Sequence, residues 1–206
     1  MASLSRLLLG YLVFVGILVA LKKLAPEWTV TGTVAACFLV PFVSATHPTR
    51  RSLFQPRWKA TLQSLYDGGI ASLVLLPVFL GVVYFLGEWS PQPLSASSLT
   101  EHAVREILAV ALPEEFFFRG YLQGELDRVW KRRVRVRGAP CGWGLLLAAA
   151  LFACSHVLLR GEVRALLVVF PGLIFGWLYA RRRSIAGPVI FHAACNLSRL
   201  ACPGWM

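Results

Sequence analysis

Residues Leu112 to Gly124 read LPEEFFFRGYLQG and place two glutamates and an arginine inside an otherwise apolar stretch. A charged side chain near the centre of a bilayer costs about 2.5–3.5 kcal/mol on insertion scales. Three charges in one membrane segment therefore indicate that they pair with each other, that they perform chemistry, or both. The rest of the chain separates these possibilities.

The composition indicates a membrane protein. The chain has 206 residues, of which 57% are hydrophobic and 15% are charged, whereas soluble domains average about 45–50% apolar and about 25% charged residues. The formal net charge is +11, but the basic residues cluster in short loops between apolar runs. This pattern sets the orientation of a membrane protein and does not form a nucleic-acid-binding face, so we expect the lipid bilayer as a partner and no nucleic acid.

Apolar runs predict an all-α polytopic membrane bundle of about seven transmembrane helices, since a spanning helix needs about 20 mostly apolar residues. The predicted spans are residues 7–21, 28–45, 68–87, 104–129, 142–159, 165–180 and 185–200. Residues 1–100 thus hold three N-terminal spans, and residues 101–206 hold four. We expect both parts to form a single integrated domain.

Lysines and arginines predict the orientation of the chain. With the N-terminus in the cytoplasm, fourteen of them fall on the cytoplasmic side and six on the outer side. The excess favours a cytoplasmic N-terminus. We therefore predict a multi-pass integral membrane protein, located in the inner (cell) membrane of a bacterium.

The predicted fourth helix carries Glu114, Glu115 and Arg119. Glu115 and Arg119 are four residues apart, so they share a helix face and can pair. Glu114 lies about 100° around the helix and is left without a helical partner. Apart from these three residues and the two histidines described next, we expect the ionisable residues to lie at helix ends or in loops.

Two further helices add His156, and then His192 with Asn196 four residues later. A carboxylate such as Glu114 together with a histidine can bind and deprotonate a water. A second histidine and an asparagine can donate hydrogen bonds to a developing oxyanion. This set is sufficient for peptide hydrolysis without a serine or cysteine nucleophile.

Three motifs in this order resemble those of a known family. The segment EEFFFR begins at Glu114 and matches E-E-x-x-x-R, FACSH ends at His156 and matches F-x-x-x-H, and HAACN begins at His192 and matches H-x-x-x-N. The chain resembles the CPBP-family intramembrane glutamic proteases, also called the Abi family, which include type II CAAX prenyl proteases and bacteriocin-processing enzymes. The resemblance covers about residues 101–201, and the first three helices match only in hydropathy.

The resemblance implies a role for each residue. Glu114 would activate water with help from His156, while His192 and Asn196 would form the oxyanion hole. Glu115 and Arg119 would be the supporting structural pair. The implied activity is that of an intramembrane endopeptidase, which would cleave a membrane-associated peptide or protein near its C-terminus or leader without a cofactor.

Other functions remain open at this point. Glu114, His156 and His192 could instead hold a catalytic zinc ion, although the sequence has no H-E-x-x-H helix to fix two ligands. The pocket could also belong to a peptide-binding, lipid-binding or immunity protein without activity, or to a proton-coupled transporter. Counting residues from the helix ends predicts that the site lies in the outer half of the membrane.

Overall fold

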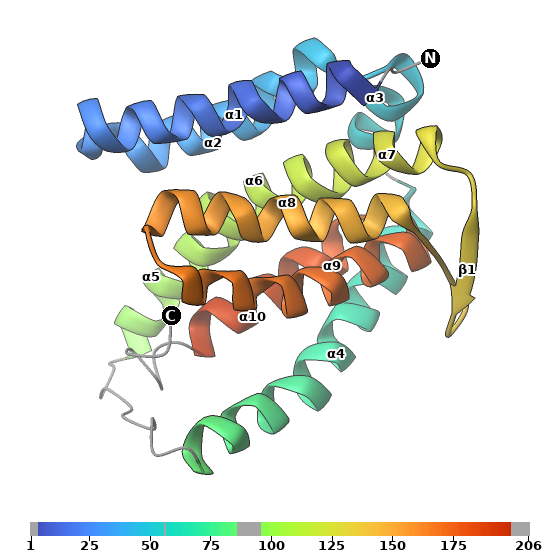
Figure 1. The fold of residues 1–206 in the computed structure, drawn as a ribbon. Coiled ribbons are helices and arrows are strands. Elements are labelled where there is room, and N and C mark those ends of the chain that lie inside the picture. Colours follow the sequence, from blue (N-terminus) through green and yellow to red (C-terminus); the bar gives the residue numbers. More distant parts are fainter. Residues whose placement is uncertain (1–3, 56, 86–95, 199–206) are drawn as a thin grey trace.

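The computed structural model describes residues 4–55, 57–85 and 96–198, and Figure 1 shows their arrangement. The elements are α1 (Leu4–Leu24), η1 (Pro26–Trp28), α2 (Thr29–Ser44), α3 (His47–Phe54), α4 (Trp58–Phe85), α5 (Ala96–Arg105), η2 (Glu106–Ala111), α6 (Leu112–Glu115), η3 (Phe116–Gln123), α7 (Gly124–Val129), β1 (Arg133–Val136), β2 (Ala139–Gly142), α8 (Trp143–Arg160), η4 (Val163–Val168), α9 (Val169–Arg182) and α10 (Ala186–Ser198). The predicted helical membrane bundle is confirmed.

Five of the described helical stretches are long and apolar enough to cross a membrane, and they overlap five of the seven predicted spans, the third of which begins at Trp58 rather than at residue 68. They are Leu4–Leu24, Pro26–Ser44, Trp58–Gly81, Trp143–Arg160 and Val163–Arg182. Many of their large apolar side chains are exposed on the outside of the bundle, as expected where lipid rather than water surrounds a protein.

The other two predicted spans are helical but differ from these five. The fourth is a continuous run of short helical segments from Ala96 to Val129. Charged residues interrupt its apolar sequence but not the helix itself. The seventh corresponds to α10, whose 13 described residues extend about 20 Å at 1.5 Å per residue. Its predicted end at residue 200, like the end of the third span at residue 87, lies outside the described residues.

Buried aromatic rings join the N-terminal helices to the rest of the bundle. Phe14 of α1 stacks on Phe117 of η3, with ring centroids 3.9 Å apart. Tyr11 of α1 donates a hydrogen bond to the carbonyl oxygen of Leu151 in α8 at 2.9 Å. In Figure 1, α1 and α2 lie side by side along the top of the bundle, above α8. These contacts make α1 part of the wall around the polar segment.

Two glycines allow α4 and α10 to touch backbone to backbone. A Cβ atom added at Gly68 would collide with the carbonyl of Gly187, and one added at Gly187 would collide with the carbonyl of Ser64. The backbone N–H of Gly187 donates to the Ser64 hydroxyl at 2.8 Å. Small residues drive close helix packing of this kind in membranes, and here they fix the start of the helix that carries His192.

The helix between Ala96 and Val129 contains two π-helical segments, η2 and η3. Pro113 follows the first of them and cannot donate a backbone hydrogen bond, so a regular α-helical ladder cannot continue through this point. The wider turns accommodate the proline without breaking the helix. π-helical turns are rare and are frequent at functional sites.

Sequence analysis placed the start of the fourth span at residue 104 and so missed most of α5. It also did not predict two elements that lie between spans, α3 and the β1–β2 hairpin. The hairpin pairs Arg133 with Gly142 and Val136 with Ala139, and its turn places Arg137 and Gly138 at φ values of 47° and 85°. Positive φ at both central residues suits a two-residue hairpin turn. Both elements lie in basic segments between spans, where hydropathy carries no signal.

Candidate active site

Five helical elements bring together the predicted site residues and one further carboxylate. Glu114 and Glu115 lie on α6, Arg119 on η3, His156 on α8, and His192 and Asn196 on α10, while Glu106 begins η2. Figure 1 shows α6, α8 and α10 converging in the part of the bundle below α1. We call these seven side chains the polar centre.

Glu115 is the most enclosed carboxylate of the polar centre, with a side chain that is 0% exposed. Its Oε1 atom lies 2.8 Å from Nδ1 of His192. Its Oε2 atom lies 3.3 Å from Nε of Arg119, an ion-pair distance without hydrogen-bond alignment. A buried charge needs such partners, because removal from water without them costs several kcal/mol. Glu115 therefore links the arginine on its own helix to the histidine on α10.

Arg119 is also fully buried, and its other contacts explain how the fold tolerates it. Its Nη2 donates to the carbonyl oxygen of Gly172 at 3.1 Å. Its guanidinium carbon lies 4.6 Å from the ring centre of Phe152 and 5.1 Å from that of Phe175. Aromatic faces attract cations, most strongly where water is excluded. The arginine thus connects η3 to α8 and α9.

The orientation of His192 is fixed from two sides. Its ring stacks on Phe175 with centroids 4.8 Å apart and planes 14° apart. Because Glu115 accepts from Nδ1, that nitrogen carries a proton. The opposite atom, Nε2, faces Glu114, whose Oε2 lies 3.9 Å away.

Glu114 differs from its neighbour in burial and in partners. Its side chain is 18% exposed, and its Oε2 atom is buried without a hydrogen-bond partner among the described residues. Unpaired buried polar atoms are rare in folded proteins and require a specific reason. Here the unpaired oxygen points toward an imidazole nitrogen just beyond hydrogen-bond distance.

His156 approaches the same region from α8. Its Nδ1 lies 3.0 Å from the carbonyl oxygen of Phe152, one helical turn earlier. A carbonyl can only accept, so Nδ1 donates and Nε2 of a neutral ring keeps its lone pair. The ring of Phe152 contacts both imidazoles, with centroids 4.4 Å from His156 and 5.8 Å from His192. The structure records no hydrogen bond between the described side chains of Glu114 and His156.

Asn196 has a partner that sequence analysis missed. Its Nδ2 donates to Oε2 of Glu106 at 2.9 Å, and the other oxygen of Glu106 lies 2.8 Å from Nη2 of Arg105. Glu106 is 8% exposed, so the expectation that the remaining ionisable residues lie at helix ends or in loops was wrong for this carboxylate. Glu106 lies inside a predicted span, eight residues before Glu114. A carboxylate at such a position could have been recognised from the sequence as a candidate site residue.

Glu114, His156 and His192 were also considered as zinc ligands. Within residues 4–55, 57–85 and 96–198, no group of three or more histidine, cysteine, aspartate or glutamate side chains is placed to hold a metal ion. The Nδ1 atoms of His192 and His156 are engaged by Glu115 and by the Phe152 carbonyl. Each Nε2 is therefore the atom that could bind a metal, and the bond at Nδ1 would orient the ring for it.

Comparison with protein families identifies the bundle. A family model described as Type II CAAX prenyl endopeptidase Rce1-like matches residues 96–198. The chain belongs to this family. The match contains all seven side chains of the polar centre and excludes α1 to α4. No curated protein and no solved structure gives a match.

Membership in the Rce1-like family confirms the resemblance on which sequence analysis relied. It identifies the chain as an integral membrane protein of a protease family whose members act on membrane-associated proteins. In this Rce1-like chain, the matched segment begins with α5 and ends with α10, so the helices that carry the polar centre are the ones that define the family.

Proposed function

We propose that the chain is an intramembrane endopeptidase that uses Glu114 to activate a water molecule. Glu114 and Nε2 of His192 can both contact one water, because their atoms are 3.9 Å apart and neither has another hydrogen-bond partner in the described chain. The observation that carries this proposal is the position of Glu114, whose Oε2 is buried without a hydrogen bond among the described residues and lies 3.9 Å from Nε2 of His192. Glu106 is bonded at both oxygens, and Glu115 is held by His192 and by its ion pair with Arg119.

The reaction follows from these positions. Water oxygen attacks the carbonyl carbon of the scissile peptide bond, and its proton passes to Glu114, assisted by the lone pair on Nε2 of His156. The tetrahedral intermediate then collapses with cleavage of the C–N bond. Glu114 returns the proton to the departing amine, so the carboxylate is restored.

His192 and Asn196 stabilise the oxyanion formed in this step. Nε2 of His192 can donate only if the ring is doubly protonated, since Nδ1 already donates to Glu115. Glu115 fixes the plane of the ring, as a carboxylate does for the histidine of a serine protease triad. Glu106 holds one N–H of the Asn196 amide and leaves the second available to the oxyanion.

Conservative replacement of the proposed base tests this function. Glu114→Gln keeps the size of the side chain and removes its basicity, so hydrolysis should fall by about 10²–10⁴-fold with little change in thermal stability. The assay is cleavage of a membrane-anchored peptide, found by screening C-terminal and leader sequences, by the purified full chain in liposomes. The exposed Glu101 on the same helical run provides a matched control, Glu101→Gln, which should retain full activity.

The same assay separates the alternatives. Near-normal turnover by Glu114→Gln would refute the proposed mechanism. Loss of wild-type activity with a strong chelator, and its recovery with added zinc, would make Glu114, His156 and His192 metal ligands. A chain that binds peptides tightly but cleaves none of them would favour a binding or immunity protein.

We also propose that the N-terminus is cytoplasmic and that the polar centre opens toward the outer half of a bacterial inner membrane. The hairpin then lies in the cytoplasm, and the connection after α8 lies outside. A cysteine replacing Arg135, in a variant without the native cysteines, should react with an impermeant reagent only after intact cells are permeabilised. A cysteine replacing Glu162 should react without permeabilisation. The reverse pattern would place the site in the cytoplasmic half.

A further inference from the structure

The short helix α3 lies on the membrane surface, because it directly joins two candidate spans, Pro26–Ser44 and Trp58–Gly81. One side of it is fixed to the bundle. The backbone N–H and hydroxyl of Thr46 donate to Oε1 of Glu125 at 2.7 Å and 2.6 Å. Arg128 donates to the hydroxyl of Thr49 at 3.0 Å. The opposite side of α3 is left facing outward.

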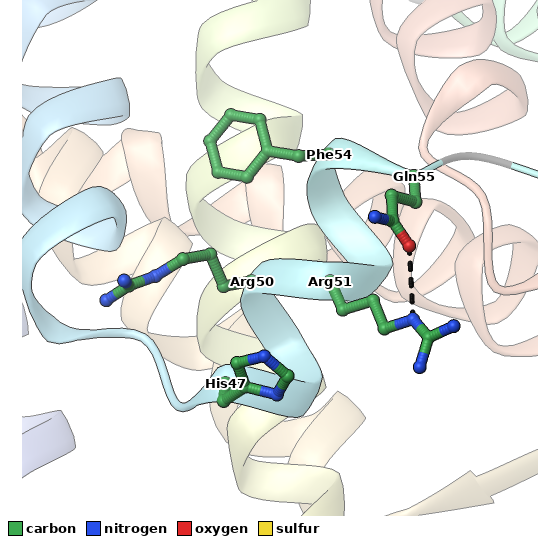
Figure 2. A pocket seen from close by; sticks show the side chains of 5 residues that line it. All are labelled: His47, Arg50, Arg51, Phe54 and Gln55. Carbon is green, nitrogen blue, oxygen red and sulfur yellow. Dashed lines mark hydrogen bonds between the residues drawn. The ribbon is translucent and has the colours of Figure 1, made fainter.

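This outward side is hollowed and combines cationic with aromatic side chains. A depression of about 440 Å³ is lined by His47, Arg50, Arg51, Phe54 and Gln55, and we call it the α3 pocket (Figure 2).

An exposed aromatic pair adjoins the cations of the α3 pocket. The rings of Phe54 and Phe42 pack edge to face at 6.4 Å, and their residues are 52% and 57% exposed. The guanidinium of Arg50 lies over Phe42 at 5.6 Å. A cation beside exposed aromatic rings at a bilayer surface is the pattern of an interfacial lipid contact.

The arginines of the α3 pocket keep their charge available. Arg51 donates from Nε to the neutral side-chain oxygen of Gln55 at 3.1 Å, the contact drawn in Figure 2. Arg50 makes a long contact of 3.4 Å with the carbonyl oxygen of Ala45. In the described part of the chain, neither arginine forms an ion pair with a carboxylate. By contrast, Arg182 at the end of α9 is bonded to Asp67 at 2.6 Å.

We propose that the α3 pocket binds the phosphate of an anionic phospholipid headgroup. A guanidinium matches the geometry of phosphate oxygens. Figure 2 shows Arg50 and Arg51 extending to opposite sides of α3, so each can donate to a headgroup that lies against this face of the helix. The position of α3 between two membrane spans, and the exposed Phe42 and Phe54 beside the cations, favour a lipid over a soluble anion. The bound lipid would contact the rings with its glycerol and acyl region. This site is separate from the chemistry at Glu114.

Native mass spectrometry of the detergent-solubilised full chain tests the proposal. Phosphatidylglycerol and phosphatidylcholine with identical acyl chains are titrated separately, and we expect phosphatidylglycerol to bind at least tenfold more tightly. The double variant Arg50→Gln/Arg51→Gln should bind phosphatidylglycerol at least tenfold more weakly, since it loses the charged donors that hydrogen-bond to the phosphate. Its binding of phosphatidylcholine should be unchanged.

A matched variant distinguishes a site from general attraction to positive charge. Arg132→Gln/Arg135→Gln removes two exposed cations from the hairpin region, and it should keep wild-type affinity within about threefold. Equal losses in the two double variants, or no loss in the first, would overturn the proposal. Displacement of phosphatidylglycerol by inorganic phosphate, beyond that by chloride at equal ionic strength, would identify a soluble-anion site and overturn the assignment to lipid.

Discussion

The polar centre and the basic surface around α3 and the hairpin hold arginines under opposite conditions. Arg119 in the polar centre is 0% exposed and contacts a carboxylate, a carbonyl and aromatic rings. Arg51 in α3 is exposed and bonds to a neutral amide. The same side chain therefore neutralises a buried charge in one region and presents charge to the surroundings in the other. Burial, rather than residue type, determines what its removal should do.

The largest effect on stability is expected from Arg119→Ala. Removing the guanidinium leaves the carboxylate of Glu115 buried beside His192 without its arginine, and breaking a buried pair in this way costs about 3–5 kcal/mol. We expect a low folded yield and a strongly reduced unfolding midpoint in detergent. Arg51→Ala is the matched change on the exposed surface and should shift stability by less than about 0.5 kcal/mol. Equal midpoints for the two variants would remove the contrast between the regions.

A graded effect on catalysis is expected from the pair formed by Asn196 and Glu106. Asn196→Ala should lower kcat by about 10²–10³-fold, as for loss of one oxyanion donor. Glu106→Ala should lower kcat by about 10–100-fold with little change in KM, because it acts only by positioning the amide. Glu106→Gln retains an accepting oxygen and should recover most of this loss. If Glu106→Gln were no better than Glu106→Ala, the positioning role would be refuted.

The smallest effect is expected from Arg182→Gln. Arg182 bonds to Asp67 with N···O distances of 2.6 Å and 3.3 Å, but its side chain is 27% exposed. Partly exposed ion pairs contribute about 0–1 kcal/mol because solvent screens them. Denaturant unfolding in a mild detergent measures the change. A loss as large as that in Arg119→Ala would show that α4 and α9 depend on this contact far more than its exposure suggests.

Local signals explain what the sequence could predict. Apolar runs of about 20 residues are contiguous, so the spans follow from hydropathy. The spacing of Glu115 and Arg119 is one helical turn, and their ion pair could be expected from it. Glu114 was the carboxylate left over by the same argument, and the structure leaves its Oε2 without a partner among the described residues.

Contacts between distant segments could not be predicted in this way. Glu115 bonds to His192 across 77 residues, and Glu106 bonds to Asn196 across 90. Neither pairing leaves a periodic pattern, because both depend on how η2 and α6 pack against α10. The motifs did indicate which residues belong to the site, but not that Glu115 would orient His192. The basic segment before Gly138 concealed a hairpin, since its charges dominate its hydropathy.

The π-helical segments η2 and η3 constrain the number of residues in the helical run from Ala96 to Val129. Each residue of an α-helix turns the chain by about 100°, whereas a π-helical turn accommodates an additional residue. Deleting one residue between Glu106 and Glu115 would return the wide turn of η2 to the regular ladder and rotate one of these glutamates against the other. Glu106 and Glu115 could then no longer face α10 together. In this helix the number of residues is as much a determinant of the site as their identity, and deletions here should be harmful even where each neighbouring substitution is tolerated.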